Sequence, residues 1–213
     1  MLNITTLTFG LFGVNTYVVW NPTTREAVVI DPGMMYEREN QALDIFVAEN
    51  SLEVKQVINT HMHVDHIFGN HYVTSRYGVH SAAGEADAFL GEQAAAQARM
   101  FSLPVSLEPV AVDEYLSDGE KIDICGEEVT VLAVPGHSPG SIALYFTQSG
   151  WVITGDALFA GSIGRTDLVA GNLSVLLRSI REKLLTLPPS TVVYPGHGGP
   201  TTIGEESRSN PYI

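Results

Sequence analysis

Three histidines and one aspartate fall within seven residues of this chain, in the segment THMHVDH at positions 60–66. The segment follows a predicted strand at Val54–Asn59, and titratable groups placed there are costly to bury without a partner. Histidine nitrogens and carboxylate oxygens, with no thiolate among them, are ligands that suit Zn, Fe or Mn. We therefore expect a metal to bind here, held by side chains drawn from His61, His63, Asp65 and His66.

The same arrangement, an apolar strand followed by an imidazole or a carboxylate, occurs three more times. The side chains are His137, Asp156 and His197, after predicted strands at Glu128–Val134, Trp151–Thr154 and Thr191–Tyr194. Loops at the ends of strands converge above a rigid base, where ligands commonly bind. An isolated histidine is more often an ordinary surface or core residue, and we interpret His71 and His80 in that way.

The spacing predicts two groups of metal ligands joined by a bridge. One metal would be held by three nitrogens, from His61, His63 and His137. A second metal would be held by Asp65, His66 and His197, with Asp156 between the two. Metals about 3.5–4 Å apart can share a hydroxide whose pKa is near neutrality. That hydroxide can attack a carbonyl group, and Asp65 can orient it or take a proton as well as bind metal.

Composition limits the classes of partner. The 213 residues are 45% hydrophobic and 16% charged, which allows a sizeable core. A net charge of −13 with only 11 Lys and Arg argues against nucleic acid as a partner. No apolar run has the length of a membrane span, and the N-terminus lacks a signal-peptide pattern. We expect a cytoplasmic protein without a membrane partner; the lone Cys125 suits a reducing compartment, and the oligomeric state is left open.

Apolar periodicity predicts two groups of strands, each with helices. Strands are expected at 4–9, 16–20, 27–30, 54–59, 79–80, 121–124, 128–134, 141–146, 151–154 and 191–194. Helices are expected at 36–50, 67–77, 85–100 and 173–184, followed by a Gly/Pro-rich tail. Helix 85–100 has a thin apolar face and is interpreted as a surface lid over a pocket walled by Phe101, Tyr145 and Phe159. The simplest arrangement is one domain over 1–213, an α/β fold of four layers, αββα.

The complete set of ligand positions resembles the metallo-β-lactamase superfamily. The set is T-H-x-H-x-D-H at 60–66, G-H at 136–137, G-D at 155–156 and G-H at 196–197. Ile30-Asp31-Pro32-Gly33 resembles the first motif of that superfamily, which supports the site from behind. The resemblance covers essentially the whole chain and implies a four-layer αββα sandwich of the metallo-β-lactamase type.

Two longer segments are similar to the single-domain, glyoxalase-II-like branch of the superfamily. They are residues 158–168, LFAGSIGRTDL, and 196–206, GHGGPTTIGEE, with Asn210-Pro211 beyond. The resemblance implies hydrolysis of S-D-lactoylglutathione or a similar acyl thioester by metal-bound hydroxide, with one or two Zn ions, or Fe or Mn. Arg165 is a candidate for binding an anionic group of the substrate, with a structural salt bridge as the alternative, and Tyr145 is a second candidate contact. Only a short tail follows His197, so the helical domain with which two-domain relatives bind glutathione is missing, and other thioesters remain candidates.

Two alternatives stay open. The persulfide dioxygenase branch shares G-x-G-R-T-D and places a single iron on positions matched here by His61, His137 and Asp156. From another class, the chain could be a non-catalytic metal-binding protein, although such members usually lose a ligand. A β-lactamase is disfavoured by the missing signal peptide.

Overall fold

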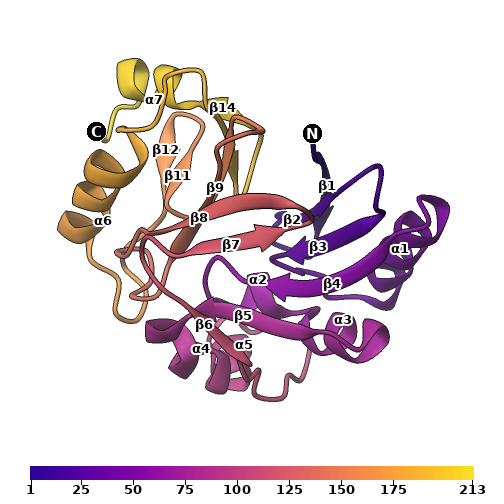
Figure 1. Cartoon of the computed structure of the whole chain (residues 1–213). Coiled ribbons are helices and arrows are strands. Elements are labelled where there is room, and N and C mark those ends of the chain that lie inside the picture. Colours follow the sequence, from indigo (N-terminus) through magenta and orange to yellow (C-terminus); the bar gives the residue numbers. More distant parts are fainter.

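The computed structural model describes residues 1–213, which form two six-stranded sheets packed face to face with helices on both outer sides (Figure 1). In Figure 1, α1 and α3 lie outside one sheet, and α6 and α7 lie outside the other. This is the four-layer αββα arrangement expected from the sequence.

The N-terminal sheet has the strand order β1-β2-β3-β4-β5-β6. Its strands are β1 (Asn3–Phe9), β2 (Val14–Trp20), β3 (Glu26–Ile30), β4 (Glu53–Ile58), β5 (His80–Gly84) and β6 (Glu114–Leu116). β1 to β3 form an antiparallel meander, and β3 to β6 are parallel. Because parallel strands end at the same edge, the loops after β3 and β4 emerge side by side.

The second sheet has the order β14-β13-β10-β9-β8-β7. Its strands are β7 (Lys121–Ile124), β8 (Glu127–Ala133), β9 (Ile142–Phe146), β10 (Trp151–Gly155), β13 (Val192–Pro195) and β14 (Thr201–Thr202). β10 and β13 are parallel, whereas β9 is antiparallel to both β8 and β10. The carboxyl ends of β8, β10 and β13 therefore share one edge. A small hairpin of β11 (Leu158–Phe159) and β12 (Ser162–Ile163) follows β10.

The helices cover the outer faces of the sheets and the edge that carries the ligand loops. Beside the first sheet lie α1 (Glu37–Glu49), α2 (Val64–Ile67), α3 (Asn70–Tyr77), η1 (Glu85–Asp87), α4 (Ala88–Glu92) and α5 (Ala94–Met100). Beside the second lie α6 (Leu173–Ser179), which continues into the π-helical turn η2 (Ile180–Leu184), and α7 (Ile203–Ser209). Asn172 caps α6, since its side chain accepts a hydrogen bond from the Val175 amide.

Strand alternation divides the apolar residues between two kinds of core. In β3, Val28 and Ile30 face the other sheet, whereas Ala27 and Val29 pack with the residues of α1 and α3. In β9, Leu144 lies between the sheets, whereas Tyr145 packs on the opposite face with the α6 cluster. A side chain on that outer face cannot point into the space between the ligand loops.

Three local predictions need correction. The helix expected at 67–77 is two helices, since α2 carries Asp65 and His66 and the chain bends at Gly69, whose added Cβ would lie 2.9 Å from the Pro32 carbonyl oxygen. The short strand expected at 79–80 extends to Gly84 as β5. The Gly/Pro-rich tail contains β14 and α7, because Thr202 accepts a hydrogen bond from the Glu205 amide and starts a helix there.

The segment expected to be one helix at 85–100 consists of η1, α4 and α5 and is not a loosely packed surface element. Leu90 and Ala94 are buried and pack against Met62 and other residues of the first sheet's edge. The buried Gln97 side chain donates to the Met62 and Leu90 carbonyl oxygens and accepts from the Val64 amide. These contacts make the segment a fixed wall rather than a free lid.

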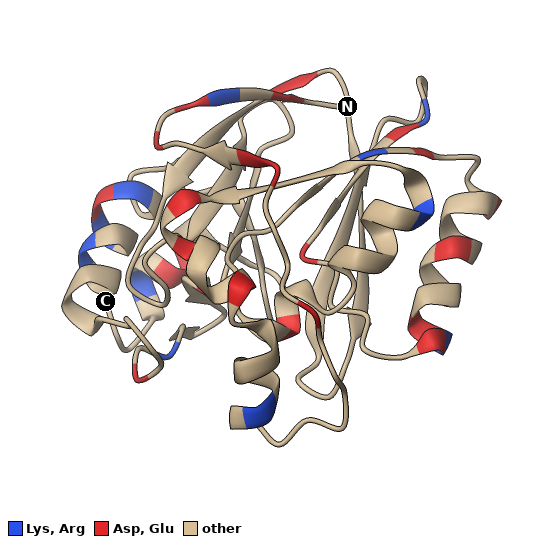
Figure 2. Ribbon diagram, turned by 90° about the horizontal axis from the view of Figure 1, so that it is seen from below, with Lys and Arg blue, Asp and Glu red and all other residues tan.

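Charged residues are distributed without a continuous basic face. Figure 2 shows Lys and Arg spread over several elements and interspersed with Asp and Glu. Phosphate backbones are bound by clustered cations, and this view shows no such cluster. None of the helices is long and apolar enough to cross a bilayer.

A substitution in the aromatic pair of β9 and β10 tests how much the core between the sheets contributes to stability. The Phe146 ring is fully buried and stacks on Trp151 with ring centroids 3.8 Å apart. We expect Phe146→Ala to lower the free energy of unfolding by about 3–5 kcal/mol, because it leaves a cavity among well-packed neighbours. Urea unfolding measures this value. Ile45→Ala, at an exposed position of α1, is the control and should change it by less than about 1 kcal/mol; an equal loss in both variants would contradict the assigned core.

Candidate metal centre

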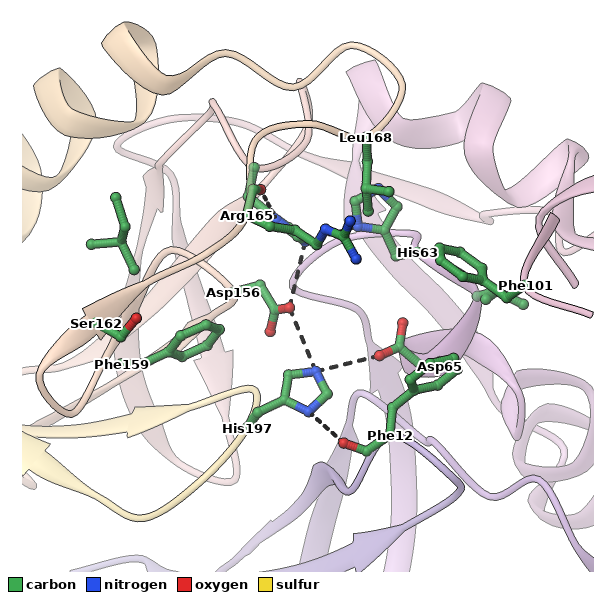
Figure 3. Close-up of a pocket in the computed structure, with 13 residues that line it drawn as sticks. Phe12, His63, Asp65, Phe101, Asp156, Phe159, Ser162, Arg165, Leu168 and His197 are labelled. Carbon is green, nitrogen blue, oxygen red and sulfur yellow. Dashed lines mark hydrogen bonds and ion pairs between the residues drawn. The ribbon is translucent and has the colours of Figure 1, made fainter. Parts of the chain in front are cut away.

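The ligand loops of both sheets meet at one edge of the sandwich, and the structure brings all seven predicted metal ligands together there. Figure 3 labels four of them, His63, Asp65, Asp156 and His197. His61 and His63 follow β4, and Asp65 and His66 lie in α2. His137, Asp156 and His197 follow β8, β10 and β13. No single element supplies more than a fraction of the site, so its geometry depends on how the two sheets pack.

The first group consists of three buried imidazoles. His137 Nε2 lies 2.8 Å from His63 Nδ1 and 3.2 Å from His61 Nε2. One proton can satisfy only one pair of such nitrogens, and these three converge on a common point. Three neutral imidazole nitrogens in this arrangement suit one divalent cation.

The second group adds a carboxylate to two further imidazoles. His197 Nε2 lies 3.4 Å from His66 Nε2 and 3.3 Å from Asp65 Oδ2. The remaining pair, His66 Nε2 and Asp65 Oδ2, is 3.8 Å apart. These three donor atoms also lie close enough together to share one ion.

Asp156 lies between the two groups. Its Oδ2 is 3.5 Å from both His137 Nε2 and His197 Nε2, and its Oδ1 is 3.4 Å from His66 Nε2. Oδ1 is buried and makes no hydrogen bond, which is an expensive state for a carboxylate oxygen unless a cation satisfies it. Asp156 therefore lies between the two groups, where it could bridge two ions, and the donor set fits one or two metal ions.

The electrostatics of the two groups differ. Burial, followed by the neighbouring His137, lowers the pKa of His63 to about 3, and burial also holds the pKa of His61 well below its usual value. Burial alone would lower the pKa of His197, but its hydrogen bonds with Asp156 and Asp65 outweigh this effect and raise it to about 10. The first group thus offers neutral nitrogens. In the second group the carboxylates of Asp65 and Asp156 favour positive charge on His66 and His197, where a metal cation would take the place of the protons.

Backbone and carboxylate oxygens behind the imidazoles fix their orientation. The Arg165 carbonyl oxygen lies 2.7 Å from His137 Nδ1, and the Phe12 carbonyl oxygen lies 3.1 Å from His197 Nδ1. Asp31 Oδ2 lies 3.0 Å from His66 Nδ1. The two carbonyl contacts hold one ring nitrogen of His137 and of His197 and leave the other free to face a metal, whereas the Asp31–His66 contact is an ion pair without a hydrogen bond.

Asp31 acts from behind the site rather than as a ligand. Its two carboxylate oxygens accept hydrogen bonds from the Thr60 amide and hydroxyl at 2.7 and 2.6 Å. Asp31 is fully buried and has a φ of 51°, an unusual value for a residue with a side chain. Its position agrees with the supporting role that the resemblance implied.

The two Pro-Gly-His turns require glycine for steric reasons. A Cβ on Gly196 would lie 2.1 Å from Asp156 Oδ1 and 2.8 Å from His66 Cε1. Gly136 has a φ of +133°, and a Cβ there would lie 2.2 Å from the Leu176 amide nitrogen. Glycine in these turns therefore lets the backbone lie closer to the ligand side chains and to α6 than a residue with a Cβ would allow.

Asp87 is a residue that the sequence interpretation missed. It is fully buried in η1 and accepts hydrogen bonds from the Met62 amide at 3.1 Å, the Ser138 hydroxyl at 2.6 Å and the Gly140 amide at 2.5 Å. Met62 lies between two ligands and Ser138 follows a third, so one carboxylate joins two ligand loops. Nothing in the spacing around Asp87 distinguishes it from a surface carboxylate.

A cavity of about 350 Å³ opens over the ligands. The predicted wall residues Phe101 and Phe159 line it, together with Phe12 and Leu168, which the sequence did not indicate. In Figure 3, Phe101 and Phe159 lie on opposite sides of the cavity. Phe12 comes from the β1–β2 turn, far from the other walls in sequence, and its ring contacts that of Phe101 edge to face at 5.8 Å.

The two predicted substrate contacts have different outcomes. Arg165 lines the cavity, but its guanidinium also forms a two-pronged ion pair with Asp167 at 2.7 and 2.9 Å. Tyr145 does not line the cavity and packs against the α6 cluster instead, so the structure does not support it as a substrate contact. Its place in β9 points it away from the edge between the sheets.

The two histidines expected to be ordinary lie outside the centre. His71 Nε2 is paired with the Pro109 carbonyl oxygen at 3.0 Å. His80 is largely exposed, 3.7 Å from an Asp113 oxygen.

Comparison with known proteins identifies relatives over the whole chain. The family model described as the metallo-beta-lactamase superfamily matches residues 9–197. The protein named hydroxyacylglutathione hydrolase GloC, from Haemophilus influenzae, is 36% identical over 214 residues, which cover 100% of this chain and 98% of that protein.

Solved structures are similar as well. BLEG-1 B3 metallo-beta-lactamase is 32% identical, with a TM-score of 0.90 over 99% of both chains. TTHA1623, solved in a di-iron-bound form, is 34% identical with a TM-score of 0.86 over 98% of this chain and 100% of that one. ETHE1 from Myxococcus xanthus is 31% identical with a TM-score of 0.78 over 98% and 83%.

Removal of one nitrogen of the first group should disable the centre without unfolding it. We expect His61→Ala to lower the amount of metal bound per chain and to reduce catalytic turnover by at least about 100-fold. This loss is larger than the one expected when a residue that only hydrogen-bonds to a metal ligand is removed. Elemental analysis and steady-state kinetics measure both, and circular dichroism checks the fold. His71→Ala, the matched control, should keep its metal and its turnover. Full metal content in His61→Ala would exclude His61 as a ligand.

The carboxylate of Asp87 should control metal affinity from outside the ligand set. Asp87→Asn replaces one acceptor oxygen with an amide that cannot accept all three hydrogen bonds, and we expect metal binding to weaken by about 10–100-fold. Competition with a coloured chelator gives the dissociation constant. Asp113→Asn, which alters a carboxylate hydrogen-bonded to Ser81, is the control and should change it less than about twofold. An unchanged constant in Asp87→Asn would show that the two loops hold their geometry without it.

Proposed function

Because this chain belongs to the metallo-β-lactamase superfamily, we propose that it is a metal-dependent hydrolase of acyl thioesters such as S-D-lactoylglutathione. The observation that carries the proposal is the convergence of all seven donor side chains, with an orphaned Asp156 oxygen at their centre. The similarity to a hydroxyacylglutathione hydrolase over the full length of the chain supports the reaction class.

The residues present suit zinc, with iron or manganese as alternatives. His61, His63 and His137 would hold one ion, while Asp65, His66 and His197 would hold a second, with Asp156 shared. A set of nitrogens and carboxylate oxygens without a thiolate does not select among these metals. A divalent ion bound here lowers the pKa of a coordinated water and polarises a carbonyl oxygen.

We assign to Asp65 the role of accepting a proton from the attacking water. Its carboxylate lines the cavity, and Oδ2 lies 3.3 Å from His197 Nε2. Burial would raise the pKa of Asp65, but the charge of His66 and the hydrogen bond with His197 outweigh it and keep this carboxylate ionised. An ionised carboxylate at the cavity floor can orient the attacking water and accept its proton.

The cavity walls suit a thioester. Phe12, Phe101 and Phe159 provide apolar surface that limits the access of bulk water to the reacting carbonyl. A thiolate leaves without much protonation, so the chain need not supply a dedicated acid on the leaving-group side. Arg165, at the cavity edge, is the one Arg or Lys side chain that lines the cavity and could meet an anionic part of the substrate, and it shares its charge with Asp167.

An oxygen-dependent reaction is the second candidate. His137 Nε2 lies 3.2 Å from His61 Nε2 and 3.5 Å from Asp156 Oδ2, a set of two imidazoles and one carboxylate that suits a single non-haem iron. The hydrolase is favoured because three further donors, from Asp65, His66 and His197, lie 3.3 to 3.8 Å from one another at the adjacent position.

Turnover of a thioester without oxygen tests the proposal. We expect the purified protein, after elemental analysis of its metal, to hydrolyse S-D-lactoylglutathione anaerobically, since water is the only co-reactant. Removal of metal by a chelator should abolish turnover while circular dichroism still shows a folded chain. Oxygen uptake with glutathione persulfide and one iron per chain would instead support the dioxygenase, and a chelated sample with full turnover would contradict metal catalysis.

The same preparation separates two other outcomes. Cleavage of a chromogenic cephalosporin in place of the thioester would indicate a β-lactamase. Metal binding without turnover in any of the three assays would favour a non-catalytic metal-binding protein.

A further inference from the structure

Beside His63 and next to the main cavity lies a second, smaller cavity of about 40 Å³, here called the compartment. The compartment lies between α4–α5 and residues Leu168-Val169, and it shares His63, Phe101 and Leu168 with the main cavity. Figure 3 shows these three side chains on one side of the cavity, across from Phe159 and Ser162. A group attached to the reacting carbonyl can therefore extend past His63 into it.

The side chains that line the compartment are mostly apolar, but only some of them are buried. Leu90 is buried, whereas Ala96, Met100 and Val169 line the compartment from exposed positions. The buried amide of Gln97 also reaches it, but its oxygen and nitrogen already make three hydrogen bonds with the main chain. The remaining polar side chain, Gln93, lies at an exposed position. A polar group that enters deeply would lose its hydrogen bonds to water without replacement.

The volumes of the compartment and of the main cavity indicate which part of the substrate, the acyl chain or the thiol, fits each of them. A volume of about 40 Å³ holds about three water-sized groups, which corresponds to a short carbon chain. The main cavity of about 350 Å³ is open to solvent and can take a bulky thiol carrier. The acyl chain therefore fits the small compartment, and the thiol fits the large one.

We propose that the site is selective for thioesters of short, unbranched aliphatic acids, whose acyl chain of about three carbons beyond the carbonyl fills the compartment beside His63. The inference rests on the proposed thioester hydrolysis and differs from the lactoyl example given there, because it favours an acyl chain without a hydroxyl group. The anchored segment from η1 to α5 keeps the compartment at a fixed size, because Asp87 and Gln97 tie it to the ligand loops.

A chain-length series with one thiol tests the selectivity. We expect kcat/KM for glutathione thioesters to rise by about fourfold per methylene from acetyl to butyryl, the factor for removing one methylene from water, and to stop rising at hexanoyl and octanoyl. The 3-hydroxybutyryl thioester should be about tenfold poorer than butyryl, because its hydroxyl would lie unpaired in the compartment. Values that agree within twofold across the series, or a preference for the hydroxylated chain, would overturn the inference.

A variant locates the effect. Ala96→Leu narrows the compartment from an exposed position of α5, and we expect it to move the optimum from butyryl towards acetyl. Ala95→Leu makes the same change at the neighbouring position, which does not line the compartment, and should leave the optimum at butyryl. The same shift in both variants, or in neither, would place the selectivity elsewhere. If no thioester of any length is hydrolysed, the proposed function fails, whereas turnover without chain-length dependence contradicts only the acyl selectivity.

Discussion

The constraint on which this structure depends is that seven polar donors must be held within a few ångströms of one another while most of them are buried. Imidazole nitrogens 2.8 to 3.4 Å apart, next to carboxylates, cannot all be satisfied by protons. The folded chain must therefore supply rigidity that the site itself does not. That rigidity comes from the two sheets, whose strands end at a common edge. The apolar core between the sheets, and not the polar site, provides the tight packing.

Support for the site comes from groups that never meet a substrate. Asp31 holds Thr60 and the back of His66, and Asp87 joins the loops around Met62 and Ser138. Both are buried carboxylates that accept hydrogen bonds, and Asp31 also pairs with His66. Asp31 ties the loop after β3 to the loop after β4, whereas Asp87 joins the loops after β4 and β8, so a displacement of one of these two loops is resisted by the other. This cross-connection lets short turns carry metal ligands without a disulfide.

The convergence of the seven candidate side chains and the layer order were predictable from the sequence because both depend on local patterns. Apolar runs that end in His61, His137 or His197 mark strand ends, and a common edge follows from strands of one direction. The structure does not support the prediction of Tyr145 as a substrate contact, because nearness to a strand end does not determine which face of the sheet a side chain lies on. Its neighbour Leu144 lies on the face between the sheets, and Tyr145 lies on the opposite face. Asp87 was missed because its role depends on contacts with residues 25 and more positions away. The helix α7 was missed because glycine and proline obscured its Thr202 cap.

The donor set by itself carries little information about the substrate. A chain named as a β-lactamase and one named as a hydroxyacylglutathione hydrolase are both similar to this protein over nearly its whole length. The side chains that line the cavity must then distinguish one substrate from another. Here they include Phe12, Phe101 and Leu168, which come from three separate segments of the chain. Loops tolerate substitution better than the strands that position the metal ligands, since few buried contacts depend on them. Specificity in such a fold can therefore change without disturbing the centre, and the shape of the space beside His63 says more about the substrate than the histidine itself does.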